Sequence, residues 1–212
     1  MAAGAAALIG VLDLQGAVSE HIDALKAARA RPVRVKRTRE LEGLDGLVIP
    51  GGESTTIGRL AREYGFIEAV RRRAAEGMAV WGTCAGLILL AKEIKDGVPD
   101  QPSLGLMDIT AVRNGFGRQV DSFEADLDVA GISGRPFRAV FIRAPYIERV
   151  GTGVQVLAEF EGKVVAARQG RLLATAFHPE LTGDARIHRY FVRMAAGAPG
   201  EAGEVGAART AG

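Results

Sequence analysis

Cysteine, histidine and long apolar runs are all scarce in this chain of 212 residues. Its one cysteine, Cys84, excludes an intrachain disulfide framework and fits a reducing compartment. The apolar runs are too short to cross a bilayer, and the Ala-rich start lacks the basic segment of a signal peptide. We therefore expect a cytoplasmic protein that makes no membrane contact.

The sequence also has little net charge and no metal-binding pattern. A formal charge of +2 gives no reason to expect a polyanionic partner. The basic runs at 34–40 and 71–73 carry no interleaved aromatic residues, so we interpret them as solvated faces rather than a nucleic-acid site. No His, Cys and Asp cluster has metal-ligand spacing, and we predict neither a metal nor an organic cofactor.

Strand-like and helix-like segments alternate through the first half of the sequence. Apolar runs predict strands at 7–15, 32–37, 46–52 and 78–84. Helical spacing predicts helices at 18–30, 54–65, 66–77 and 85–94, the second with Ser54 as its N-cap. Repeated β-α units with apolar strands predict a mostly parallel sheet that is covered on both faces.

The second half alternates apolar and polar residues, which predicts added antiparallel strands over 103–129, 136–150 and 154–177. Hairpin turns are expected at 161–163 and 169–171, and an amphipathic helix at 185–196. We expect one domain over residues 8–196, with a mobile N-terminal extension at 1–7 and a disordered Gly/Ala-rich tail at 197–212.

Cys84 lies between glycines at a predicted strand-to-helix junction, in Gly82-Thr83-Cys84-Ala85-Gly86. This is the pattern of a nucleophile elbow, in which the glycines permit a sharp turn. The helix N-terminus then favours the thiolate. A buried structural cysteine is the alternative, and this segment alone favours neither interpretation.

A thiolate nucleophile needs a base, and the base needs an acceptor that orients it. His178 follows an apolar strand, and Glu180 can accept its Nδ1–H. His21 and His188 lie on amphipathic helices, where an exposed or structurally satisfied histidine is the usual case. We therefore expect the chemistry at His178 and none at the other two histidines.

Four predicted strands end in polar or glycine-rich segments, at 13–16, 50–54, Cys84 and 177–180. In open α/β sheets such ends form the binding edge. The N–H of Ala85 and the backbone of Gly51 and Gly52 are candidate donors for an oxyanion. The segment at 50–54 is also consistent with a phosphate-binding nest or with a tight strand-to-helix turn. Considered alone, it favours the tight turn.

Seven segments carry a family resemblance, at 10–21, 47–60, 81–94, 116–127, 141–147, 164–170 and 177–182. Together they resemble the triad class of glutamine amidotransferases, and within it the family of glutaminase subunits of pyridoxal 5'-phosphate synthase. The motifs LQGAVSEH, PGGEST and FGRQVDSF distinguish this family from other triad glutaminases. The resemblance implies a class I glutamine amidotransferase-like (flavodoxin-like) three-layer α/β fold.

The resemblance also implies roles for particular residues. Cys84 would be the nucleophile, and His178 with Glu180 would complete a triad that hydrolyses L-glutamine to L-glutamate and ammonia through a thioester. The implied glutamine contacts are Gly52, Glu53, Ser54, Arg113, Ile142 and Arg143. Which arginine meets the substrate carboxylate stays open, because Arg143 is equally well explained as a structural salt-bridge partner.

The implied partner is a separate synthase subunit, a (β/α)₈ barrel, in a large hetero-oligomer. That subunit would use the ammonia to make pyridoxal 5'-phosphate, which is then a product and not a cofactor of this chain. Two alternatives remain: a triad glutaminase serving another synthase, such as that of imidazole glycerol phosphate, and a non-catalytic glutamine-binding module.

Two residues depart from the family pattern. Asp13 stands where the family often has a small residue, and we expect it to alter the local field. Gly115 stands where a serine is expected, which predicts a looser loop after Arg113.

Overall fold

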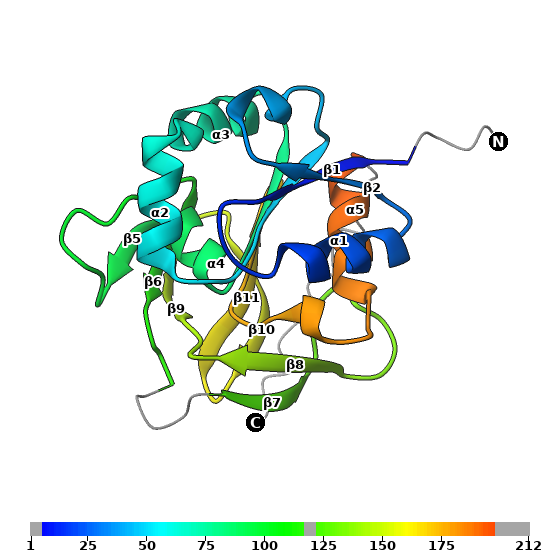
Figure 1. The fold of residues 1–212 in the computed structure, drawn as a ribbon. Coiled ribbons are helices and arrows are strands. Elements are labelled where there is room, and N and C mark those ends of the chain that lie inside the picture. Colours follow the sequence, from blue (N-terminus) through cyan, green and yellow to red (C-terminus); the bar gives the residue numbers. More distant parts are fainter. Residues whose placement is uncertain (1–5, 117–121, 198–212) are drawn as a thin grey trace, which may run out of the picture.

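The computed structural model describes residues 6–116 and 122–197. A ten-stranded sheet with helices on both faces dominates it (Figure 1). Five parallel strands, in the order β2-β1-β3-β4-β12, form one half of the sheet. They are β1 (Leu8–Leu12), β2 (Arg31–Val35), β3 (Gly46–Ile49), β4 (Ala79–Thr83) and β12 (Leu172–Thr175).

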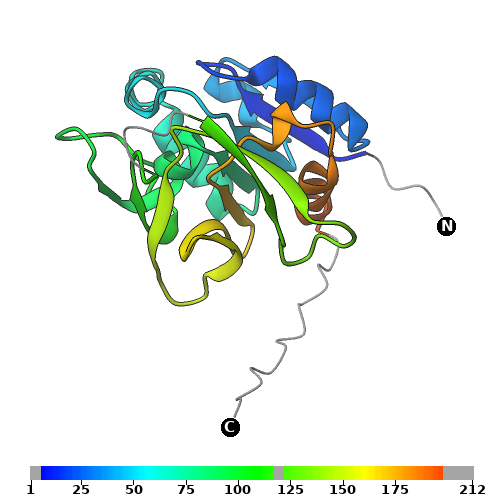
Figure 2. The same ribbon diagram turned by 90° about the horizontal axis from the view of Figure 1, so that it is seen from below.

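The other half of the sheet is largely antiparallel, as the alternating pattern predicted. It contains β5 (Ala91–Lys95), β6 (Met107–Val112), β9 (Tyr146–Val150), β10 (Gln155–Phe160) and β11 (Lys163–Gln169). β7 (Ser122–Leu127) and β8 (Phe137–Ile142) pair as a separate two-stranded sheet, visible from below in Figure 2. Glu161, Gly162 and Gly170 have positive φ angles and lie in the two predicted hairpin turns.

Helices cover the parallel half on both faces. In Figure 1, α1 (Val18–Ala27) and α5 (Arg186–Ala195) lie on one side of the sheet. On the other side are α2 (Ser54–Glu63), α3 (Phe66–Ala75) and α4 (Ala85–Leu90). The short 3₁₀ segments are η1 (Thr38–Leu41) and η2 (Pro179–Leu181). Every residue of β3 and β4 is therefore buried, which explains their uninterrupted apolar sequences.

The core of the parallel half is centred on Trp81, which is completely buried. Its ring packs against Phe191 of α5, and its Nε1–H donates to Oγ1 of Thr175 at 3.1 Å. Burying one large apolar side chain contributes about 1.5–3 kcal/mol. The satisfied indole N–H avoids the cost of an unpaired buried donor.

One predicted helix is wrong beyond Leu90. The chain leaves α4 there and enters β5, where Ala91 pairs with Met107 and Ile94 with Ala111 of β6. All six residues of α4 are buried, so the sequence has no polar face to mark where helix changes to strand.

The predicted mobile segments fall mainly on residues 1–5 and 198–212, outside the described residues. The FGRQVDSF motif also lies partly outside them, at 117–121. The assignment of residues 8–196 to one domain stays a prediction. Each helix in the described ranges is too short or too polar to cross a bilayer.

Gly86 tests the close packing of α4 against β3. A Cβ added there would lie 2.2 Å from the carbonyl oxygen of Ile49. We expect Gly86→Ala to lower the free energy of unfolding by at least about 2 kcal/mol, because backbone must shift. Gly183→Ala is the matched control, since a Cβ there meets nothing within 4 Å. Equal urea-unfolding curves for the two variants would contradict the packing.

Candidate active site

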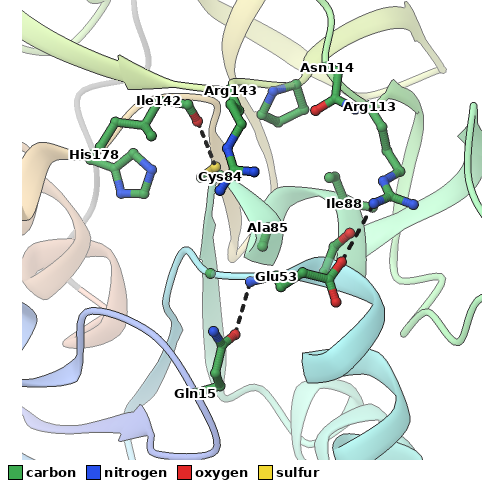
Figure 3. A pocket seen from close by; sticks show the side chains of 13 residues that line it. Gln15, Glu53, Cys84, Ala85, Ile88, Arg113, Asn114, Ile142, Arg143 and His178 are labelled. Atoms are coloured by element: carbon green, nitrogen blue, oxygen red, sulfur yellow. Dashed lines mark hydrogen bonds and ion pairs between the residues drawn. The ribbon is translucent and has the colours of Figure 1, made fainter. Parts of the chain in front are cut away.

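A cavity of about 280 Å³ opens at the carboxyl ends of the parallel strands (Figure 3). Its volume lies at the lower end of the range for small-molecule pockets, roughly 300 Å³ upward, and suits an amino-acid-sized ligand. The residues lining it are Gln15, Gly52, Glu53, Ser54, Cys84, Ala85, Ile88, Arg113, Asn114, Ile142, Arg143, Pro145 and His178. The predicted convergence of strand ends is therefore present in the structure.

Cys84 occupies a sharp turn between β4 and α4, with φ of 50° and ψ of −104°. A non-glycine residue at such a positive φ costs about 1–3 kcal/mol and needs support from its surroundings. The Cys84 N–H donates to Thr175 O at 2.8 Å, and its carbonyl accepts from Leu87 N at 3.1 Å. Gly82 is required because a Cβ there would lie 2.2 Å from the Gly86 oxygen. This geometry is that of a nucleophile elbow.

His178 and Glu180 meet Cys84 from the end of β12. The Nδ1 atom of His178 lies 2.8 Å from Oε1 of Glu180, and both residues are buried. The backbone N–H of His178 donates to Val140 O of β8 at 2.8 Å. Gly51 fits between these two side chains, because a Cβ there would lie 2.4 Å from Cε1 of His178 and 3.2 Å from Cβ of Cys84.

The electrostatics of this group favour a charged imidazole. Burial would lower the pKa of His178, but hydrogen bonds to Cys84 and Glu180 and their negative charges outweigh burial and raise the pKa to about 10. His178 is therefore an imidazolium at neutral pH, able to give a proton to a leaving group. Sγ of Cys84 also lies 3.8 Å from Ile142 O.

The candidate oxyanion donors come from two loops. Ala85 is the first residue of α4, directly after Cys84. The Gly51 carbonyl faces Gly16 in the loop after β1. A Cβ added to Gly16 would lie 1.9 Å from the Gly51 carbonyl oxygen. Because N–H and C=O point in opposite directions across one peptide, the Gly52 N–H points away from Gly16.

Glu53, and not Ser54, is the N-cap of α2. Its carboxylate accepts from the N–H of Thr55 at 2.9 Å and of Thr56 at 2.7 Å. The predicted cap was wrong because the chain is still extended at Glu53, which leaves Ser54 as the first helical residue. Partial burial would raise the pKa of Glu53, but the hydrogen bonds from Thr56 and Thr55 hold it at about 2.

The two candidate arginines lie in different surroundings. Nη2 of Arg113 is 3.5 Å from Oε1 of Glu53, and its Nη1 donates to Oε1 of Gln101 at 3.2 Å. Gln101 in turn donates to Oγ of Ser54 at 3.3 Å. Arg143 is exposed and lines the same cavity as Cys84 (Figure 3), and it forms no ion pair within the described ranges. Its alternative interpretation as a salt-bridge partner therefore gains no support.

The departures from the family pattern have local explanations. The carboxylate of Asp13 is bound by Arg34 at 3.1 Å and Lys36 at 3.5 Å, which compensates its charge. Gly115 is held by two hydrogen bonds, and the expectation of a looser loop stays a prediction. Its N–H donates to Ala144 O at 2.9 Å and its carbonyl accepts from Lys163 at 2.8 Å.

Several neighbours of the cavity were not singled out from the sequence. Asn114 and Gln101 carried no motif that could have marked them. Gln15 belongs to the predicted strand-end segment 13–16 and lines the cavity, and its Oε1 accepts from the Glu53 N–H at 2.9 Å. His21 and His188, where no chemistry was expected, are both completely buried, and Nε2 of His21 lies 3.4 Å from Oε2 of Glu180.

The described residues contain no group of three or more His, Cys, Asp or Glu side chains arranged to hold a metal ion.

Comparisons with known proteins identify relatives across most of the chain. The model of the SNO glutamine amidotransferase family matches residues 11–197. Pyridoxal 5'-phosphate synthase subunit PdxT of Frankia casuarinae is 59% identical over 184 residues, covering 87% of this chain and 92% of the relative. The protein of the same name from Niallia circulans is 60% identical over 186 residues, covering 88% and 96%.

Solved structures agree with these relatives. A crystal structure of a glutamine amidotransferase matches with a TM-score of 0.84 and 54% identity, covering 89% of this chain and 98% of that one. PurLQS from Thermotoga maritima matches with a TM-score of 0.64, covering 91% and 96%, but at 15% identity it shows the fold alone.

Glu53→Ala tests the observed cap. We expect the free energy of unfolding to fall by about 0.5–2 kcal/mol at pH 7, the usual cost of a lost cap. Since the pKa of Glu53 is depressed to about 2 in the folded state, this stabilisation is present above pH 4.5 and is lost as the pH falls from 4.5 towards 2. Ser54→Ala is the control, and a larger loss in that variant on urea unfolding would argue against the assignment.

Proposed function

The chain belongs to the SNO glutamine amidotransferase family, as its motifs predicted, and we propose that it hydrolyses L-glutamine to L-glutamate and ammonia through Cys84, His178 and Glu180. The observation that carries this proposal is the meeting of a strained, glycine-flanked Cys84 with a buried His178–Glu180 pair in one small cavity. Nucleophile, base and orienting carboxylate then occur in the order that acyl transfer requires.

The first half-reaction forms a thioester. The Cys84 thiolate attacks the side-chain amide carbon of glutamine, and the C–N bond breaks as the His178 imidazolium gives its proton to the leaving nitrogen. The products are ammonia and a γ-glutamyl thioester on Cys84. Neutral His178 then removes a proton from water, which attacks the thioester and releases glutamate. Glu180 holds the imidazole through Nδ1 throughout both steps.

The negative charge on the tetrahedral intermediates needs fixed donors. We assign these to the Ala85 N–H beside the nucleophile and to the backbone N–H groups of Gly51 and Gly52. One such donor is worth about 10²–10³ in rate in enzymes where it has been removed.

The substrate backbone has an α-carboxylate and an α-ammonium to be matched. Arg113 suits the carboxylate, because Glu53 and Gln101 already orient its guanidinium in the cavity wall and leave further N–H donors free. We assign a supporting role to Gly52, Ser54 and the backbone of Ile142 and Arg143. Because Glu53 already accepts three hydrogen bonds from Thr55 and Thr56, a backbone carbonyl is the better acceptor for the ammonium.

Ammonia released into water is protonated and lost as a nucleophile, so a glutaminase of this kind needs an acceptor enzyme. The relatives are named subunits of pyridoxal 5'-phosphate synthase. We therefore assign this chain to the same kind of complex, in the cytoplasm, with a (β/α)₈-barrel synthase subunit that receives the ammonia.

Ammonia release from glutamine tests this function. We expect the purified chain to release ammonia when the cognate synthase subunit is present, and Cys84→Ala to abolish that release because no thioester can form. Strong ammonia release that is equal with and without the synthase subunit would indicate a different acceptor enzyme for the ammonia. Confirmed complex formation without any release would contradict catalysis and favour a binding module.

The assignment of Arg113 has a separate test. We expect Arg113→Gln to raise the KM for glutamine about 10- to 100-fold, the equivalent of roughly 1.5–3 kcal/mol for a hydrogen bond to a charged group. Arg143→Gln is the matched variant and should change KM less than about threefold, because only its backbone is assigned to the substrate. Steady-state kinetics in the complex measure both, and a reversed order would transfer the carboxylate contact to Arg143.

A further inference from the structure

All three histidines of the chain lie in one buried row behind Cys84. His178 binds Oε1 of Glu180, and on the far side of that carboxylate lies His21 of α1, with Nε2 at 3.4 Å from Oε2. Nδ1 of His21 is in turn 3.1 Å from Nε2 of His188 on α5. The side chains of His21 and Glu180 have no exposed surface. The glutaminase chemistry described above makes no use of His21 or His188.

The second carboxylate oxygen of Glu180 is the part of this row that lacks a satisfactory partner. Within the described residues, Oε2 is buried and has no well-aligned hydrogen-bond donor. The nitrogen next to it is Nε2 of His21, which lies at a similar distance, 3.3 Å, from Oγ1 of Thr83. A buried carboxylate oxygen is costly to leave unpaired. Nε2 of His21 is therefore the group placed to stabilise it.

The charge state of the two distal rings follows from their burial. Burial, together with the charges of His188 and His178, lowers the pKa of His21 well below its ordinary value. Burial also lowers the pKa of His188 to about 3. Both rings are neutral at neutral pH, and each carries one N–H. The titratable groups that face His21 are thus Glu180 of η2, His188 of α5 and His178.

The contacts select one tautomer for each neutral ring. A bare Nε2 on His21 would turn a lone pair towards the Glu180 carboxylate, so the N–H belongs at Nε2. Nδ1 of His21 must then accept, and His188 donates to it through Nε2. This leaves Nδ1 of His188 as a bare acceptor, and it is indeed the atom of that ring without a partner in the described structure.

Aromatic packing holds both rings in place. Trp81 meets His21 edge to face at 5.7 Å between centroids and meets His188 likewise at 4.9 Å. Its own N–H is tied to Thr175. Neither histidine ring can therefore turn without displacing the central side chain of the core, which makes the row a rigid support.

We propose that His21 is a positioning residue for the Cys84–His178 pair, its Nε2–H supporting the Glu180 carboxylate while His188 fixes its tautomer. This proposal rests on the proposed glutaminase function. An N–H at Oε2 holds the carboxylate so that Oε1 stays on Nδ1 of His178, which stabilises the imidazolium and, through it, the thiolate. His21 acts through Glu180 and touches no substrate.

Two amide substitutions at position 21 distinguish a positioning role of His21 from a role in packing alone. The side-chain amide of glutamine reaches about as far as Nε2 of histidine, where its nitrogen can donate, whereas the amide of asparagine reaches only the position of Nδ1, where its oxygen can accept from His188. His21→Gln thus keeps a donor for Glu180, and His21→Asn keeps only the contact to His188. Both variants bury one neutral amide at position 21 and differ by one methylene, so urea unfolding reports any difference in packing, and the reactivity of Cys84 reports the support of Glu180.

Alkylation of Cys84 by iodoacetamide provides the readout, because it is the only cysteine and the thiolate is the reacting form. We expect His21→Asn to move the midpoint of the pH–rate profile upward by about one pH unit, while His21→Gln stays near the wild type. In the complex, His21→Asn should lower kcat about tenfold with KM nearly unchanged, the size of effect seen when an outer hydrogen-bond partner is lost.

Identical alkylation profiles for wild type and both variants would overturn the proposal, as would an equal shift in the two variants. Alkylation does not require turnover, which keeps this test distinct from that of the function. A shifted profile in His21→Asn beside a wild type that releases no ammonia would uphold the positioning role and reject the glutaminase. Ammonia release by the wild type, together with unshifted alkylation profiles in both variants, would uphold the glutaminase and reject the positioning role. Urea unfolding of each variant verifies that it is folded.

Discussion

The turn at Cys84 is the constraint on which the site depends. A side chain at φ of 50° is held there only because β4, β12 and α4 fix the backbone on both sides through hydrogen bonds to Thr175 and from Leu87. Glycines make the turn possible, since Gly82 lies against Gly86 and Gly86 against the backbone of β3. The proposed nucleophile is thus held by a deeply buried part of the sheet and not by a free loop, which fixes its position before any ligand arrives.

Placing a carboxylate and an imidazolium in that interior creates an electrostatic problem. A buried pair gains stability only if its remaining polar atoms are also satisfied. One oxygen of Glu180 is satisfied by His178, and the structure places Nε2 of His21, itself 3.3 Å from Oγ1 of Thr83, next to the other. Neutral histidines suit this position, because they offer an N–H to the anion without adding a second buried charge that would compete for it.

The sequence reveals some of this arrangement and conceals the rest for physical reasons. Strands buried on both faces leave continuous apolar runs, so the strand ends that carry Cys84 and His178 were predictable. The end of α4 at Leu90 was not predictable, because a helix buried on every side has no repeat of polar residues whose end would mark the end of the helix. The pairing of His21 with His188 could not be predicted either. The pattern of each helix indicates a polar residue at that position but not its partner, which lies 167 residues away in the sequence.

The loop after β1 belongs to the site as much as the loops that carry the predicted residues. The side-chain oxygen of Gln15 accepts from the Glu53 N–H, and Gly16 allows the Gly51 carbonyl to approach where any side chain would clash. The orientation of the Gly51–Gly52 peptide therefore depends on where the β1 loop lies. Glu53 extends the same dependence to α2 through its cap and to Arg113 through its ion pair. A displacement of the β1 loop would consequently reach both the proposed oxyanion donors and Arg113, because the loop contacts Gly51 and Glu53 directly.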